Sequence, residues 1–154
     1  YGKTAEKLEA DLKHAGEEGW FLQVPFLLAK ALQLKAALGE RLHLHYKDKD
    51  KAALQKDAGQ FRELLEEVKA LRLAHRQQWM KIYSPFGWSR LDLRYGGLCA
   101  RLETAIYRLD LYLDGSLSEL PELAAPRYQK DRRGQFLGNG IWRTYEGIAT
   151  LSDG

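Results

Sequence analysis

The stretch WSRLDLRYGGLCARLETAIYRLDLYL, residues 88–113, decides the fold class of this protein. Its apolar side chains recur at steps of three and four residues, which is the spacing of one face of an α-helix. The apolar stripe consists of Leu91, Tyr95, Leu98, Leu102, Ala105, Ile106, Leu109 and Leu113. At 1.5 Å per residue the pattern predicts a helix about 40 Å long. We expect Asp114-Gly115-Ser116 to end it.

The same spacing continues towards the N-terminus and predicts three more helices. The first is short, capped by Thr4, and ends at residues 16–19. The second starts near Trp20, tolerates Pro25 in its first turn, and runs through residues 26–46. The third covers residues 51–82, and the segment 84–87 separates it from the helix at 88–113. We therefore predict an all-α fold, a bundle of three long helices with short flanking helices.

The C-terminal part has a different character. A short helix is expected to occupy residues 117–124, and residues 126–154 are predicted to form an irregular loop and docking tail. Residues 127–140 are rich in charge and glycine, whereas Ile141, Trp142, Tyr145 and Ile148 give the tail apolar side chains with which to dock. Residues 1–154 are accordingly expected to form a single helical domain.

Composition limits the function. The 154 residues are fewer than the roughly 200 to 250 that a (β/α)₈ barrel needs. The net charge of +3 comes from interspersed charges, so nucleic acid is not an expected partner. Charged residues interrupt every apolar stretch before the ~18 to 20 residues of a membrane span, so no membrane partner is expected either. Cys99, as a single cysteine, cannot form an intramolecular disulfide.

The first residues suggest a fragment. The chain opens at Tyr1 without a methionine and without the apolar core of a signal peptide. We expect it to be a piece of a longer protein that continues before Tyr1. The location of the parent, cytoplasmic or exported, depends on that part and stays open.

The residues that usually carry chemistry are poorly placed for it. His43 and His45 are two positions apart and would point to different sides of a helix, so no metal site is expected. His75 lies on the apolar stripe of its helix and is interpreted as a hydrogen-bonded core or edge residue. Cys99 lies in mid-helix, where a structural thiol is the expectation. We predict no catalytic residue and no cofactor in this chain.

Two glycines stand inside the helix at 88–113. Gly96-Gly97 costs roughly 2 kcal/mol relative to two alanines, so a compensating close approach is expected. One explanation is a helix crossing within the bundle, and the other is a flat surface that accepts a partner domain. In the second case a polar and aromatic set would supply the interface. Its members are Trp88, Arg90, Asp92, Arg94, Tyr95 and Arg101.

These residues also carry a resemblance. Trp79, the segment 85–88 (PFGW), the string 91–98 (LDLRYGGL) and the string 100–105 (ARLETA) resemble the helical C-terminal domain of bacterial family 20 glycoside hydrolases, the β-N-acetylhexosaminidases. The order of the long helices, the exit YLDG at 112–115 and the closing segment 142–151 are similar too. The resemblance covers nearly the whole chain.

The resemblance implies a parent enzyme with a (β/α)₈ barrel upstream. Such enzymes hydrolyse terminal β-linked N-acetylglucosamine or N-acetylgalactosamine with retention, and the 2-acetamido oxygen of the sugar is the nucleophile. An adjacent Asp-Glu pair is their catalytic signature, and no Asp in this sequence is directly followed by a Glu. The resemblance therefore implies a non-catalytic accessory domain whose candidate partners are the barrel and, in a homodimer, a second copy. The substrate N-acetylhexosaminide belongs to the parent.

Alternatives from other classes stay open. The chain could be an autonomous helical protein-interaction module. It could also be a small-ligand-binding bundle whose pocket combines His75, Trp79, Tyr83 and Trp88. A carbohydrate-binding module is a weaker possibility, because four tryptophans on helices are explained more simply by packing. For the accessory domain, the hypothesis is that Trp88, Arg90, Asp92, Arg94 and Tyr95 face the absent domain.

Overall fold

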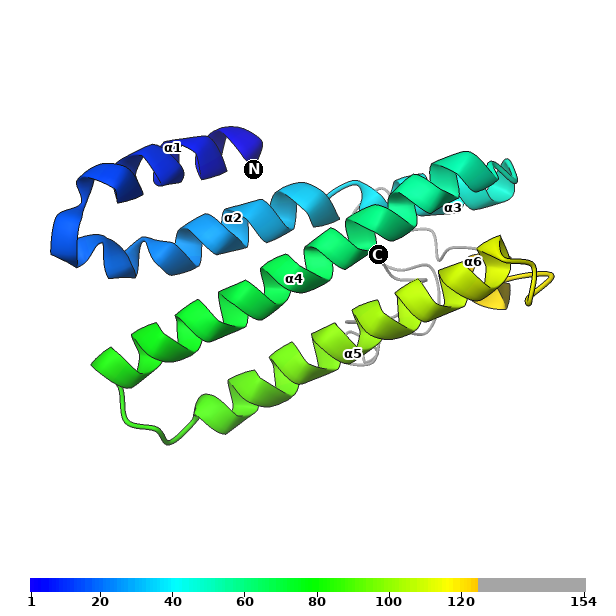
Figure 1. Ribbon diagram of the computed structural model, residues 1–154. Helices are drawn as coiled ribbons and strands as arrows, with labels where there is room; N and C mark the ends of the chain where they lie inside the picture. Colours follow the sequence, from blue (N-terminus) through cyan, green and yellow to red (C-terminus); the bar gives the residue numbers. More distant parts are fainter. Residues whose placement is uncertain (125–154) are drawn as a thin grey trace, which may run out of the picture.

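The computed structural model describes residues 1–124, and every regular element within them is a helix. Figure 1 shows the elements in chain order. They are α1 (Gly2–His14), a 3₁₀ helix η1 (Gly16–Phe21), α2 (Gln23–Lys35), α3 (Leu38–Lys47), α4 (Lys51–Ile82), α5 (Trp88–Leu113) and α6 (Pro121–Ala124). The predicted all-α class is confirmed.

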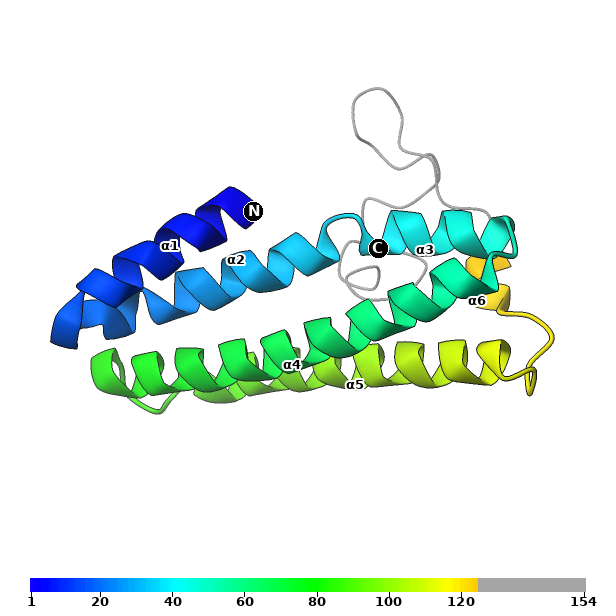
Figure 2. The same cartoon turned by 45° about the horizontal axis from the view of Figure 1, so that its top comes forward.

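Helix α4 is the central element of the fold. It packs against α5 on one side and against α2 and α3 on the other, while α1 lies on α2 (Figure 1 and, from a second direction, Figure 2). Successive long helices run in opposite directions because their connections are short. Helix α5 therefore forms one edge of the array and α1 the other.

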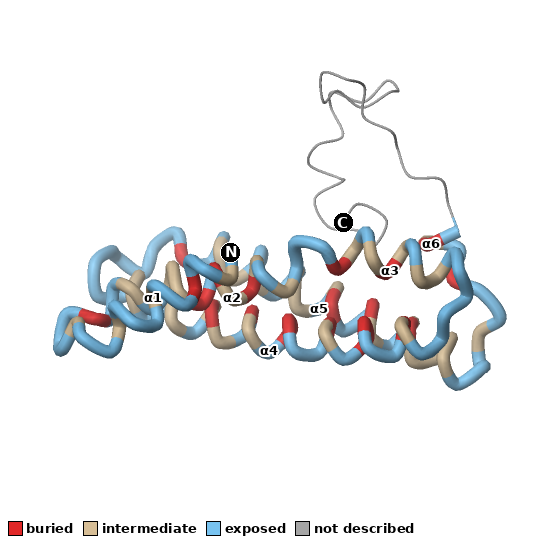
Figure 3. The backbone as a smooth tube through the Cα atoms, turned by 90° about the horizontal axis from the view of Figure 1, so that it is seen from above, coloured by how far each residue is buried: buried red, intermediate tan, exposed pale blue. Residues whose placement is uncertain are grey.

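The apolar core is unevenly distributed along the molecule. Its main cluster lies where α3 and α6 meet α4 and the second half of α5 (Figure 3). Leu42, Leu54, Leu109 and Leu120 are each at most 1% exposed there. We call this region the core end. The opposite region, around η1 and residues 83–87, is called the turn end.

The two longest helices begin and end where the sequence predicts. The Asp50 side chain accepts a hydrogen bond from the Ala53 amide at 2.9 Å, which satisfies one of the free donors in the first turn of α4. Gly87, just before α5, has φ of 94°, a left-handed conformation that glycine adopts without a steric penalty. Local sequence signals therefore fix the starts of both helices of the α4–α5 hairpin.

Other predicted boundaries are wrong. The helix expected over residues 26–46 is broken at Ala36 and Ala37, so that α2 and α3 pack separately on α4. Thr4 is not a cap, since α1 begins at Gly2 after Tyr1. The short helix expected within 117–124 covers only Pro121–Ala124. The predicted tail at 126–154 lies outside the described residues.

Candidate functional site

The start of α5 carries the residues that the sequence singled out, and the first of them, Trp88, points inward. Its side chain is 4% exposed and lies against His75, with ring centroids 5.4 Å apart and the rings nearly perpendicular. Trp79 and Tyr95 lie 6.1 and 6.4 Å away. The indole N–H of Trp88 is buried without an acceptor among residues 1–124. Trp88 is thus part of an aromatic cluster between α4 and α5.

Asp92 and Tyr95 also face α4. Asp92 Oδ1 accepts from Arg72, with Nε at 3.0 Å and Nη2 at 2.9 Å. The Tyr95 hydroxyl lies 3.0 Å from His75 Nδ1, a hydrogen-bond distance. Burial lowers the pKa of His75 below its ordinary 6.5 and raises the pKa of Tyr95 above 10.0. Both groups are therefore neutral near pH 7, and their role here is to hold the two helices together.

Arg90 and Arg94 lie on the other side of the helix. Both are exposed, and neither has a carboxylate partner in the described part of the chain. The structure therefore divides the predicted set in two: Trp88, Asp92 and Tyr95 form the hairpin contact, while Arg90 and Arg94 are available to another molecule or domain.

Gly96 and Gly97 are exposed as well. Apart from the helix's own backbone and the chain neighbours, no atom of residues 1–124 lies within 4 Å of a Cβ built at either position. A helix crossing within the described bundle therefore does not explain these two glycines. The explanation that stays open is a partner outside these residues.

The glycines belong to a continuous exposed surface that we call the outer face of α5. It runs along the side of the helix opposite to Leu102, Ala105 and Leu109. Its members are Ser89, Leu93, Gly96, Gly97, Ala100, Thr104 and Tyr107. Leu93 is 77% exposed and Tyr107 is 62% exposed. Phe86 precedes the helix and is 90% exposed. The outer face is thus apolar at intervals and nearly flat between them.

The residues proposed for a ligand pocket do come together at the turn end. The rings of Trp79 and Tyr83 have centroids 4.7 Å apart, and His75 lies 6.3 Å from Trp79. Trp79 Nε1 donates to the Ser84 carbonyl oxygen at 2.9 Å, which ties the ring to the turn. The contacts join these residues to one another, which is how a packed aromatic cluster is built.

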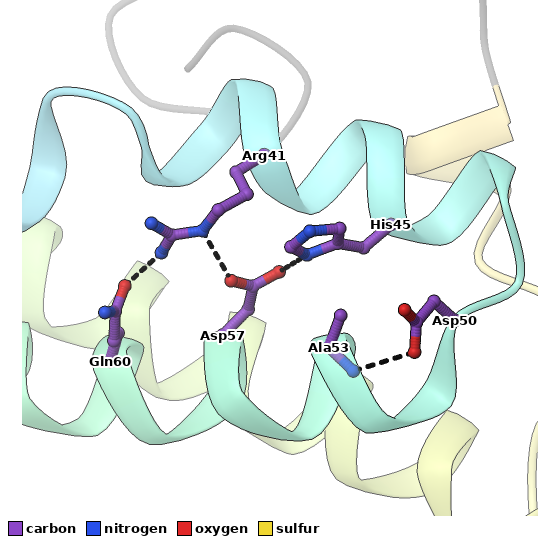
Figure 4. A network of polar contacts seen from close by, with 6 residues as sticks. All are labelled: Arg41, His45, Asp50, Ala53, Asp57 and Gln60. Carbon is purple, nitrogen blue, oxygen red and sulfur yellow. Dashed lines mark hydrogen bonds and ion pairs between the residues drawn. The ribbon is translucent and has the colours of Figure 1, made fainter.

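A polar network that sequence reasoning missed joins α3 to α4 (Figure 4). Asp57 on α4 is 1% exposed and accepts from Arg41 Nε at 2.9 Å. His45 Nδ1 lies 2.6 Å from Asp57 Oδ2, and Arg41 also donates to Gln60. A buried carboxylate needs such partners. The network therefore fixes α3 on α4. The one feature of the sequence that could have predicted it is an aspartate, Asp57, on the apolar side of its helix.

Other candidate groups are structural. Burial raises the pKa of the Cys99 thiol above 9.0, which keeps it in the unreactive protonated form. No group of three or more His, Cys, Asp or Glu side chains within residues 1–124 is placed to hold a metal ion. Over the same residues, no helix combines the length and the apolar character that crossing a membrane requires.

The fold and this site together define a class of protein. It is an all-α domain whose polar clusters tie helices together and whose edge helix leaves one face uncovered by the described residues. The chain belongs to the glycoside hydrolase 20C C-terminal domain family, whose model matches residues 1–139. The resemblance drawn from the α5 motif is thereby confirmed. No curated protein sequence matches the chain.

Membership of this family has two consequences. The chain is an accessory domain of a glycoside hydrolase, and it is linked to a catalytic domain in the same polypeptide. The same polypeptide therefore contains a further domain.

Proposed function

We propose that this domain is a non-catalytic C-terminal accessory domain of a β-N-acetylhexosaminidase, and that it supports the catalytic barrel or the assembly of a dimer. The observation that carries the proposal is the division of α5, whose inner side holds the hairpin together and whose outer face is left uncovered by residues 1–124. The absence of an adjacent Asp-Glu pair from the sequence supports a non-catalytic role. The LDLRYGGL string at 91–98 supports the choice of parent.

The parent reaction makes a sharp test possible. In substrate-assisted hydrolysis the 2-acetamido oxygen of the sugar attacks the anomeric carbon, so a sugar without that group cannot react in this way. We expect the full polypeptide to hydrolyse chromogenic β-N-acetylglucosaminide or β-N-acetylgalactosaminide and to leave the matching β-glucoside intact. Equal hydrolysis of the β-glucoside would contradict the proposed parent activity.

The supporting role has a test of its own. Arg94→Ala in the full polypeptide is expected to lower its thermal stability, activity or association, because Arg94 is exposed and unpaired among residues 1–124. Arg76→Ala is the matched control, since Arg76 is an exposed arginine on α4 without a carboxylate partner there. If the Arg94→Ala protein keeps wild-type stability, activity and association, the role assigned to this residue is refuted.

A further inference from the structure

The outer face of α5 exposes more apolar surface than a solvent-facing helix side needs. Leu93 and Tyr107 stand at its two ends, with Gly96, Gly97 and Ala100 between them. Two exposed apolar side chains on either side of a flat glycine surface form a shape into which side chains of a partner can insert. The helix also forgoes the stability that alanines would contribute at the glycines. These two features are consistent with a covered face.

The charges on α5 are arranged asymmetrically around this face. Arg90, Arg94 and Arg101 fall within about 40° of one another on one edge of the helix. No carboxylate of residues 1–124 pairs with them. By contrast, Arg41, Arg62, Arg72 and Arg108 each bind a carboxylate in the described part of the chain. Of the four arginines without a carboxylate partner in residues 1–124, three therefore lie in a row beside the outer face and the fourth, Arg76, lies on α4.

We propose that the outer face of α5 docks on the linked catalytic domain, at a surface that presents carboxylates to the row Arg90, Arg94 and Arg101 and apolar side chains to Gly96 and Gly97. This inference rests on the supporting role proposed above and names the surface that performs it. A guanidinium binds a carboxylate through two parallel hydrogen bonds, which fixes orientation as well as affinity. The linker between the domains raises their effective concentration, so a modest interface suffices.

Two other occupants fit the charges less well. Residues 125–154 contain five Lys and Arg against three Asp and Glu. Their net charge is therefore positive, as is that of the arginine row. A second copy packed antiparallel through this face would place the two arginine rows together. In a parallel arrangement its Asp92, Glu103 and Asp110 would meet the row, but Arg72 and Arg62 already bind two of these carboxylates and the third lies in the field of Lys69. The catalytic domain is the occupant that carries neither disadvantage.

The test measures whether the face is covered in the full polypeptide. On a Cys99→Ser background, Ala100→Cys places a thiol in the middle of the outer face, and Leu73→Cys places one on an exposed position of α4. We expect a maleimide to label Ala100→Cys at least about tenfold more slowly than Leu73→Cys, because a covered thiol reacts only when the contact opens. Equal labelling rates would overturn the proposal.

Charge reversal tests the chemistry of the partner. The double change Arg94→Glu and Arg101→Glu is expected to raise the labelling rate of Ala100→Cys several-fold, because like charges would then face each other. Arg76→Glu is the control and should leave that rate unchanged. An unchanged rate in the double variant would overturn the carboxylate-bearing surface.

Two further outcomes identify a different occupant, and each overturns the proposal. Protection that disappears on dilution indicates a second copy. Protection that disappears when residues 125–154 are deleted indicates the tail. Because labelling does not depend on the substrate, a full polypeptide that fails to hydrolyse N-acetylhexosaminides refutes the proposed parent activity and leaves this result standing.

Discussion

The core end and the turn end of the molecule are built on the same two helices, α4 and α5, yet they differ in how much apolar surface they bury. At the core end, α3 and α6 cover the hairpin, and Leu42 and Leu54 are fully enclosed. At the turn end, Ile82 and Tyr83 are 50% and 58% exposed. Lys81 Nζ lies 4.8 Å from the Trp20 ring centroid, which connects η1 to the end of α4.

The difference teaches that amphipathic helices alone do not close a core. The apolar stripes of α4 and α5 extend over both ends, but the fully buried side chains lie where α3 and α6 pack on the hairpin, whereas towards the turn end α2 packs mainly on α4. The turn end relies instead on aromatic packing and on two polar contacts, Arg72–Asp92 and His75–Tyr95. The four predictions below test this contrast.

The largest effect is expected from a cavity at the core end. Leu54→Ala should lower the free energy of unfolding of the 154-residue chain by about 3 to 4 kcal/mol, because the site is fully enclosed and cannot collapse. Ile82→Ala at the turn end should cost less than about 1 kcal/mol, since half of that side chain is exposed. Urea unfolding measures both. Equal losses would show that the two ends are packed alike.

Removing a polar contact should likewise cost more free energy of unfolding at the core end than at the turn end. Asp57→Ala is expected to cost about 2 to 3 kcal/mol, because it removes charged hydrogen bonds from a buried site. Asp92→Ala at the turn end should cost about 1 kcal/mol or less, because its pair with Arg72 is partly exposed. The comparison can be made by chemical unfolding at low and high salt, where only the Asp92 variant should lose its difference from the wild type.

A smaller effect of opposite sign is expected on the outer face of α5. Gly97→Ala should stabilise the 154-residue chain by roughly 0.5 to 1 kcal/mol, because the added methyl meets open space and the helix gains propensity. In the full polypeptide the same methyl should stabilise less or destabilise, if a partner approaches the glycine there. Thermal unfolding of both proteins gives the comparison, with Gly59→Ala on α4, which also faces open space, as the control.

The smallest effect is a dependence on pH at the turn end. Since burial lowers the pKa of His75 below 6.5, the unfolded chain takes up a proton first as the pH falls through 6.5. The contribution to stability is therefore present above pH 6.5 and declines between 6.5 and the lower folded value. His75→Gln should reduce this slope in unfolding measured from pH 7.5 to 5.

Much of the fold follows from local signals in the sequence. The bounds of α4 and α5 are predicted because apolar periodicity and the break at residues 84–87 act locally, and the Asp50 cap found in the structure is local as well. The break at Ala36 and Ala37 could not be predicted from the sequence, because neither residue disfavours a helix. Its position reflects the separate packing of α2 and α3 on α4. The candidate site shows the same limit, since the sequence located the α5 motif but not which of its residues face α4.

The sequence by itself determined the helical class, the α4–α5 hairpin and the motif that identifies the family, because each depends on residues that are neighbours along the chain. Only the tertiary structure decided that Asp92 pairs with Arg72, that Asp57 is buried between Arg41 and His45, and that Gly96 and Gly97 lie on a face left uncovered by residues 1–124. The physical reason is that burial and pairing depend on the rotation and register of one helix against another. Those are set by the packing of side chains far apart in the sequence.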